Sequence, residues 1–231
     1  MSTYINELLF GFYPYLAGTV FIVGSLVRFE FAQYTWRAGS SQILTARSRQ
    51  FIVGNRLFHI GILFLFFGHL VGLLTPPAVY HFLGLSAALK QKMAMTAGGI
   101  FGTLCMVGMI MLLHRRMTGQ RVRATSSQGD IFILWLLLIQ VVFGLATIFV
   151  SMQHPDGSVM VVLGEWAQRI VTFREGAALA VFNVHWLYKV HLFLGITMFL
   201  VFPFTRLVHV WSAPFMYVNR SAQIVRQKRM Y

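Results

Sequence analysis

Five long apolar stretches constrain the fold of this chain more than any other feature of its sequence. They fall at about residues 5–27, 57–75, 93–113, 131–152 and 184–211. Each has roughly the 20 residues that a helix needs to cross the hydrocarbon core of a bilayer. Only 11% of the residues are charged and 57% are hydrophobic, whereas a soluble domain has about 25% charged residues. We therefore predict an all-α integral membrane protein, a bundle of five transmembrane helices.

The connections between the five stretches are short, so residues 1–231 are expected to form a single membrane domain. The longest connection, at about 153–183, begins with Pro and Gly and continues with an apolar segment, which is typical of a short helix on the membrane surface. The first stretch lacks a basic flank and a cleavage site, so we expect it to be retained. Pro203 falls inside the fifth stretch and should kink that helix.

The net charge of +13 is distributed unevenly over the connections. Of the 19 Lys and Arg residues, 14 belong to one side of a five-helix topology. The five on the other side are Lys90, Lys92, Arg169, Arg174 and Lys189. The positive-inside rule then places the N-terminus outside and the C-terminus in the cytoplasm. The basic surplus is thus a topology signal with some attraction to anionic lipid, and it does not indicate nucleic-acid binding.

Four histidines lie deep inside two of the apolar stretches. His59 and His69 are in the second stretch, and His191 and His209 are in the fifth. A titratable ring is costly in hydrocarbon unless something binds it. Two histidine pairs on two membrane helices are therefore interpreted as axial ligands of two haems.

Helix geometry predicts how the four rings pair. His59 and His69 differ in depth by about 15 Å along a helix, so they cannot share one haem. His191 and His209, five helical turns apart, differ by about 27 Å if the fifth helix is continuous. Because the two helices run in opposite directions, His69 pairs with His191 at the outer level and His59 with His209 at the inner level. The unequal separations would require helix tilt or the Pro203 kink.

Other interpretations of the histidines stay open. Each ring could bind a backbone carbonyl or relay protons, as in a haem-free transporter. His81 and His154 fall in outer loops and His114 at the membrane surface, which leaves His185 as the only plausible substitute ligand. If both ligands are imidazoles, the iron has no open position, which favours electron transfer over oxygen chemistry.

Glycines accompany the histidines. Gly68 and Gly72 flank His69, and Gly195 follows His191 by one turn. A flat macrocycle beside its ligand needs missing side chains, so we assign these three glycines to haem binding. Close helix packing is the alternative, and it is the preferred interpretation of Gly98 and Gly102 in the third stretch, which are spaced as in GxxxG.

Lys90 stands at the outer end of the third helix in a mostly uncharged region. A cation there could donate a hydrogen bond to a quinone carbonyl. Alternatively, Lys90 and Lys92 merely extend their ammonium groups to the interface.

The residues described so far also carry a family resemblance. The motifs are LFHIGILFLFFGHLVGLLTP, KQKMAMTAGG, QRVRATS, MQHPDGS and VFPFTRLVHVWSAP. Together they resemble the gamma subunit of bacterial respiratory nitrate reductase, from about Tyr13 to the basic tail. The resemblance implies a cytochrome b of the bacterial inner membrane that oxidises quinol, menaquinol or ubiquinol, and anchors two cytoplasmic subunits. These are an iron–sulfur beta subunit and a molybdenum-containing alpha subunit.

In that family the residues matching His69 and His191 ligate the outer haem, and those matching His59 and His209 the inner haem. Quinol binds at the outer haem, near the residues matching Lys90 and His69. The resemblance thus implies the same pairing as the depth argument, and it favours Lys90 over Lys92.

The resulting hypothesis is a dihaem subunit that oxidises quinol near the outer face. Its electrons would pass through both haems to the cytoplasmic iron–sulfur subunit, for nitrate reduction on a partner subunit. The basic tail, residues 212–231, is expected to contact that partner. The alternatives are a related cytochrome b that feeds a sulfur or disulfide reductase, a haem-free transporter and a passive membrane anchor.

Overall fold

The computed structural model describes residues 2–32, 35–36, 48–124 and 126–211. In these residues every regular element is a helix, and five helices are long and apolar enough to cross a membrane. The first span, Thr3–Phe31, joins α1 (Thr3–Glu7), the π-helix η1 (Leu8–Phe12) and α2 (Tyr13–Phe31). The others are α4 (Arg49–Leu74), α6 (Ala87–Thr118), α8 (Gln128–Ser151) and α11 (Trp186–Val201). The predicted five-helix membrane fold is confirmed.

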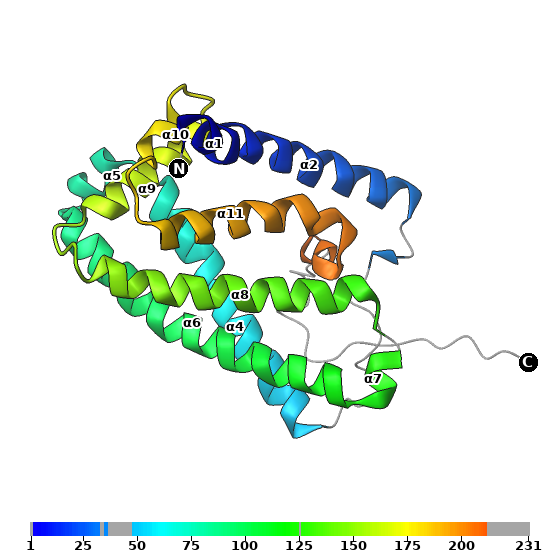
Figure 1. The fold of residues 1–231 in the computed structure, drawn as a ribbon. Helices are drawn as coiled ribbons and strands as arrows, with labels where there is room; N and C mark the ends of the chain where they lie inside the picture. The colour runs from blue at the N-terminus through cyan, green and yellow to red at the C-terminus, as the bar shows by residue number, and fades with distance from the viewer. Residues whose placement is uncertain (1, 33–34, 37–47, 125, 212–231) are drawn as a thin grey trace, which may run out of the picture.

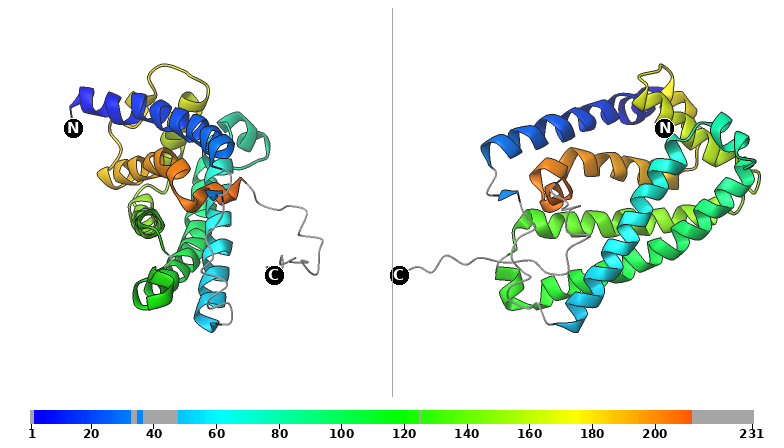
Figure 2. Two further views of the ribbon diagram at one scale, coloured as in Figure 1. Left: turned by 90° about the vertical axis from the view of Figure 1, so that its right-hand side faces the viewer. Right: turned by 180° about the vertical axis from the view of Figure 1, so that it is seen from behind.

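The five spans pack in an order that differs from their order in the sequence. Helix α11 packs between α2 and α8, α8 packs on α6, and α6 packs on α4. Helix α4 runs steeply inclined to the other spans (Figure 2). The second span, α4, and the fifth span, α11, are therefore not neighbours in this packing order. The main packing partner of α4 is α6, and those of α11 are α8 and α2.

Several spans are longer than their apolar stretches. Helix α4 begins at Arg49 rather than near residue 57, and α6 extends beyond both ends of the predicted 93–113. Polar caps account for part of this extension. Ser86 caps α6 by accepting a hydrogen bond from the Leu89 N–H, and Ser127 forms a capping box with Asp130 at the start of α8. Such caps satisfy backbone donors that the first helical turn leaves unpaired.

The fifth stretch is not the single kinked helix that we predicted. Helix α11 ends at Val201 and is followed by two 3₁₀-helices, η3 (Phe202–Phe204) and η4 (Arg206–Val210). Thr205 lies between them in an extended conformation, with φ −118° and ψ 178°. Pro203 has no backbone N–H and clashes with the preceding turn, which ends the α-helix here. The rise of about 27 Å assumed for a continuous helix therefore does not apply.

Helices α4 and α6 pack so closely that glycines on one helix lie directly against the other. A Cβ on Gly61 would lie 2.6 Å from the Cβ of Cys105, and one on Gly54 would lie 2.9 Å from that of Met111. Gly102 is similarly tight against Leu145 of α8, at 2.7 Å, which confirms its packing role. An added Cβ on Gly98 meets no atom within 4 Å, so that half of the predicted pair does not pack.

The long connection folds over one end of the bundle as α9 (Ser158–Val171) and α10 (Ala177–Ala180), near α5 (Pro77–Phe82) (Figure 1). The predicted short helix is present as α9, but it packs against other elements. Trp166 is buried, and its indole Nε1 donates to the Phe10 carbonyl in η1 at 2.9 Å. This contact joins the connection to the first span.

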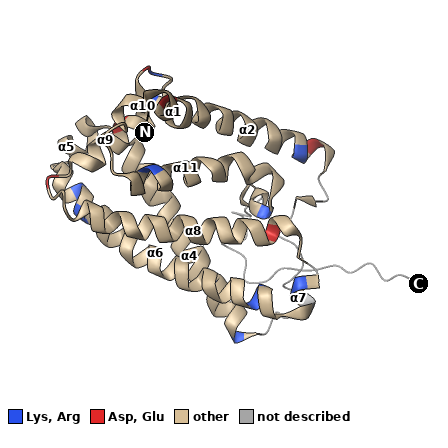
Figure 3. Ribbon diagram, viewed as in Figure 1, with Lys and Arg blue, Asp and Glu red and all other residues tan. Residues whose placement is uncertain are grey.

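Charged side chains gather at the two ends of the spans (Figure 3). Arg28 lies in the last turn of α2, and Arg115 and Arg116 in the last turn of α6, next to α7 (Gln120–Ala124). Lys90 lies in the first turn of α6, at the opposite end. The membrane side of each end stays a prediction, and the basic tail 212–231 lies outside the described residues.

Candidate functional site

His69 and His191 face each other between two helices that have other main packing partners. His69 comes from α4 and His191 from α11, and their ring centroids lie 6.0 Å apart at an interplanar angle of 43°. Two imidazoles on opposite sides of one metal ion, with metal–nitrogen bonds of about 2 Å and ring centres about 1.1 Å behind each nitrogen, have centroids about 6 Å apart. The observed separation is compatible with both rings binding one ion, and it also lies in the ordinary range of contacts between two rings.

All four predicted ligand histidines bind a backbone carbonyl through Nδ1. The ring and carbonyl pairs are His59 with Asn55 at 2.8 Å, His69 with Leu65 at 2.7 Å, His191 with Gln140 at 3.1 Å and His209 with Arg206 at 2.5 Å. A carbonyl oxygen only accepts hydrogen bonds, so Nδ1 must carry the proton in each ring. In the neutral imidazole Nε2 then has a lone pair, and the carbonyl fixes the ring orientation.

His59 and His209 are the second predicted pair. His59 lies on α4 and His209 on η4, and both rings are partly buried. Burial lowers the pKa of His209; nearby Arg206 and His59 lower it further, while the hydrogen bond to the Arg206 carbonyl opposes these effects. A lowered pKa favours the neutral form of the His209 ring, which is the form that binds a metal.

The break after α11 removes the difficulty in the depth argument. The ten residues from His191 to Val201 rise about 15 Å along α11, the same rise as the ten residues from His59 to His69 along α4. The 3₁₀ turns and the extended Thr205 follow, and they carry His209. The separation of about 27 Å assumed for a continuous helix is therefore not the separation of His191 and His209.

The glycines around the outer pair serve different purposes. An added Cβ on Gly68 or Gly72 meets no protein atom within 4 Å, so helix packing does not explain these two glycines. A Cβ on Gly195 would lie 3.2 Å from the Gln140 amide nitrogen, which places Gly195 in the contact between α11 and α8. A Cβ on Gly144 would lie 2.9 Å from His191 Cε1. Gly144 thus leaves room for the His191 ring.

Sequence reasoning missed Gly144 and Gln140. Both lie on α8, which carries no ligand histidine, and they are far from His191 along the chain. The one available signal was Gln140, a polar residue in the middle of an apolar stretch, because intramembrane polar groups usually have a functional reason.

Lys90 lies beside the end of α4 that carries His69. Its Nζ donates to the Thr75 carbonyl at 3.4 Å and stands 4.2 Å from the centre of the Tyr80 ring. The Gln168 amide donates to the same carbonyl and to that of Leu73. Lys90 is half-buried, whereas Lys92 is exposed. Thr75 follows His69 by six residues, about 9 Å along a helix, so Lys90 and the outer pair are close in depth.

The other four histidines have different environments. The His185 Nδ1 accepts a hydrogen bond from the Leu187 N–H and caps α11. The His114 ring is exposed and bonds to Gln50, and His81 and His154 are exposed near the other end of the bundle. In the described part of the chain no three or more His, Cys, Asp or Glu residues gather as a metal site.

Comparison with known proteins settles the family. The sequence model of the family "Nitrate reductase gamma subunit" matches residues 6–228. The chain belongs to this family. It is 53% identical to the respiratory nitrate reductase 2 gamma chain of Escherichia coli, over 99% of this chain and 100% of that one. It is 49% identical to the respiratory nitrate reductase 1 gamma chain of the same organism, over 97% and 99% of the two chains.

A more distant gamma chain shows the same full-length similarity. The nitrate reductase gamma chain of Bacillus subtilis is 37% identical, over 96% of this chain and 99% of its own length. Together with the five apolar helices, these matches make the protein a multi-pass membrane subunit of a bacterial respiratory nitrate reductase, located in the inner membrane. The predicted family, location and membrane class are confirmed.

Proposed function

We propose that this gamma-family subunit binds two b haems, oxidises quinol near the outer face and passes the electrons to a cytoplasmic iron–sulfur subunit. The observation that carries the proposal is the His69–His191 pair, with ring centroids 6.0 Å apart. A proton relay or a structural hydrogen bond would not require two rings from separate helices to stand at the distance of two axial ligands.

The residues of both pairs fit a haem. Each Nδ1 is occupied by a backbone carbonyl, which leaves the Nε2 lone pair of all four rings for iron. Gly68 and Gly72 place no side-chain atoms next to His69. When bound, the haem supplies an iron that takes up and releases single electrons. Two imidazole ligands leave no open position on the iron, so the chain's histidines favour electron transfer over oxygen binding.

Lys90 is the residue that we assign to quinol. Its ammonium group has three donors, and the Thr75 carbonyl accepts at the long distance of 3.4 Å. A quinol oxygen would be a better acceptor in this half-buried position. The ring of Tyr80 below the ammonium group restricts where Lys90 can reach. The protons of quinol would leave at this end, which is the outer end if the positive-inside prediction holds.

The opposite, basic end of the bundle is the expected docking face for the iron–sulfur beta subunit, with the alpha subunit that holds molybdenum behind it. Arg28, Arg115, Arg116 and Arg206 lie at this end. Inward electron transfer works against a membrane potential that is negative inside, at about 2.3 kcal/mol per charge for each 100 mV. We therefore expect the inner haem to have the higher midpoint potential.

A redox-titrated absorption spectrum of the purified complex tests the proposal. Two b-type components, of which quinol reduces both, support it. Colourless protein would refute it and would favour a transporter or a passive anchor. The matched control is the complex with His69 and His191 both changed to Ala, which should keep one component. Copurification with an iron–sulfur subunit, and quinol-driven nitrate reduction, would exclude a sulfur or disulfide reductase as the partner.

A further inference from the structure

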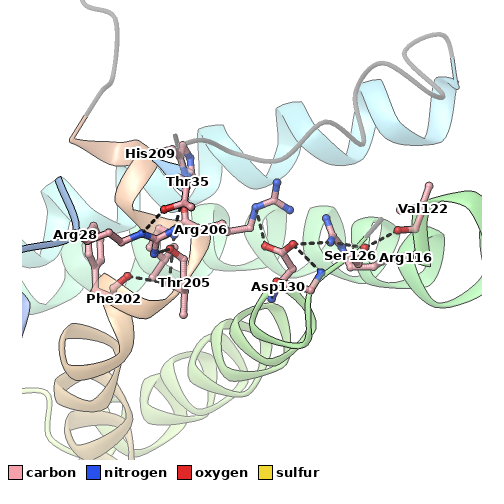
Figure 4. A network of polar contacts seen from close by, with 12 residues as sticks. Arg28, Thr35, Arg116, Val122, Ser126, Asp130, Phe202, Thr205, Arg206 and His209 are labelled. Carbon is pink, nitrogen blue, oxygen red and sulfur yellow. Dashed lines mark hydrogen bonds and ion pairs between the residues drawn. The ribbon is translucent and has the colours of Figure 1, made fainter. Parts of the chain in front are cut away.

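Polar contacts from two helices reach the irregular segment after α11, residues 202–210 (Figure 4). They come from Arg28 at the end of α2 and from Asp130 at the start of α8, and Asp130 also pairs with Arg116 at the end of α6. This segment contains His209, the only one of the four ligand histidines outside an α-helix.

Arg28 binds carbonyls that the helix break exposes. Its Nη1 donates to the Pro203 carbonyl at 2.5 Å and to the Thr205 carbonyl at 2.8 Å. Unpaired carbonyls at the edge of hydrocarbon are costly, so this double contact stabilises the break. Gly24 lets α2 come near enough for it, because a Cβ there would lie 2.9 Å from Pro203 Cγ.

Asp130 holds the next residue of the segment. Its carboxylate forms ion pairs with Arg206 at 3.6 Å and with Arg116 at 3.7 Å. The carboxylate and the Arg206 side chain are only 16% and 18% exposed, so solvent screens the pair less than it would at an open surface. The backbone carbonyl of the same Arg206 accepts the hydrogen bond from His209 Nδ1. One residue thus connects Asp130 to the histidine.

We propose that Asp130 and Arg28 are positioning residues for His209, and so determine the ligand geometry of the inner haem. This inference rests on the proposed haem binding. Arg28 fixes the backbone at Pro203 and Thr205, and Asp130 fixes Arg206, on either side of the turn that leads to the ring. The buried Val208 packs η4 against the bundle, and the polar contacts of Arg28 and Asp130 add to this packing by fixing the backbone that precedes His209 in a short 3₁₀ segment, whose own hydrogen-bond geometry is poorer than that of an α-helix.

The same carboxylate neutralises a buried cluster of guanidinium groups. Arg116 and Arg206 both face Asp130, and Arg116 also donates to the Ser126 hydroxyl at 2.7 Å. Without the negative charge, the buried Arg116 and the partly buried Arg206 would repel each other. Arg206 would then move, because its backbone belongs to the irregular segment, whereas Arg116 is held within α6.

The test is Asp130→Asn in the complete membrane complex, read by the electron paramagnetic resonance signal and midpoint potential of each haem. We expect a changed low-spin signal and a more positive potential for the inner haem, with the outer haem unchanged as an internal standard. Arg206→Gln should change the same inner signal, and the double variant should add little to either single change, because both act through one pair.

Two control variants separate this role from general effects. Ser127→Ala removes the hydroxyl that caps α8 but keeps the Asp130 carboxylate and its ion pairs. Glu30→Gln neutralises an exposed carboxylate at the same end of the bundle. Neither should shift the inner haem. If Ser127→Ala reproduces the effect of Asp130→Asn, the role of Asp130 is helix capping and the inference is wrong.

An unchanged inner haem in Asp130→Asn would overturn the inference and leave the proposed function intact. Unmodified complex without two haems would overturn both. If Asp130→Asn does not assemble, Arg28→Lys carries the test, because lysine keeps the charge but lacks the planar fork that reaches two carbonyls. It should alter the inner signal alone, and an unaltered signal would again refute the inference.

Discussion

The two histidine pairs are held in different ways. His69 and His191 both come from regular transmembrane helices, and their rings stand 6.0 Å apart where α8 leaves room at Gly144. In the other pair, His59 comes from the same helix as His69, but His209 comes from a 3₁₀ segment after a proline break. Arg28 of α2 and Asp130 of α8 make polar contacts with that segment, and Arg116 of α6 pairs with the same Asp130 (Figure 4).

Two different kinds of contact therefore position the two histidine pairs of one bundle. Steric contacts between helices determine the outer pair, whereas charge-assisted contacts with an irregular segment determine the inner pair. Changes in the size of small residues should therefore act on the outer pair, and changes in charge at the basic end should act on the inner pair.

The largest effect is expected from the ligands themselves. His191→Ala should remove the outer haem alone, and His209→Ala the inner haem alone, because each ring has one partner. Optical haem determination in the purified complex should fall from two haems to one in each variant. If His209→Ala retains two haems, or loses both, the two pairs are not independent sites.

Lys90→Ala should lower quinol oxidation by about 10- to 100-fold, the effect of losing a charge-assisted hydrogen bond of roughly 1.5–3 kcal/mol. Both haems should remain, since Lys90 does not contact either pair. The rate of quinol-dependent haem reduction measures the effect, with exposed Lys92→Ala as the control. A normal rate in the Lys90 variant would remove Lys90 from the mechanism.

Gly144→Ala should weaken retention of the outer haem by about tenfold, because overpacking costs about 1–3 kcal/mol. The new Cβ would stand 2.9 Å from His191 Cε1, so the ring must move. The inner haem should be unaffected, which the two spectral components can show. Gly98→Ala adds the same methyl group where no atom lies within 4 Å, and it should change neither haem. Equal losses from both variants would contradict the steric account.

The smallest effect concerns the end of the bundle rather than either pair. Trp166→Phe should lower the free energy of unfolding by about 1 kcal/mol, because the Phe10 carbonyl loses its indole donor. Both haem spectra should stay as they are. Thermal unfolding of the complex measures the difference, with exposed Trp186→Phe as the control. A spectral change in the Trp166 variant would show that the outer pair also depends on this cap.

Much of the site follows from one-dimensional patterns. The histidine pairs could be predicted because spacing along a helix converts directly into depth, and antiparallel spans allow only one matching by depth. Gly144 could not be predicted, because its partner His191 lies on another helix and a lone glycine in an apolar stretch is uninformative. From the sequence, Arg28 is only one of the basic residues that indicate topology, and Asp130 is only a carboxylate at the start of a helix. Packing brings their partners near: backbone carbonyls for Arg28 and arginine side chains for Asp130.

The sequence by itself determined the membrane class, the five spans, the family and the four histidines, because apolar length and residue chemistry are local properties. Only the tertiary structure decided that the fifth span breaks at Pro203, that Gly144 makes room for a ring, and that Asp130 and Arg28 hold the segment carrying His209. These features depend on which distant segments touch. That arrangement results from packing many side chains at once, and no single stretch of sequence specifies it.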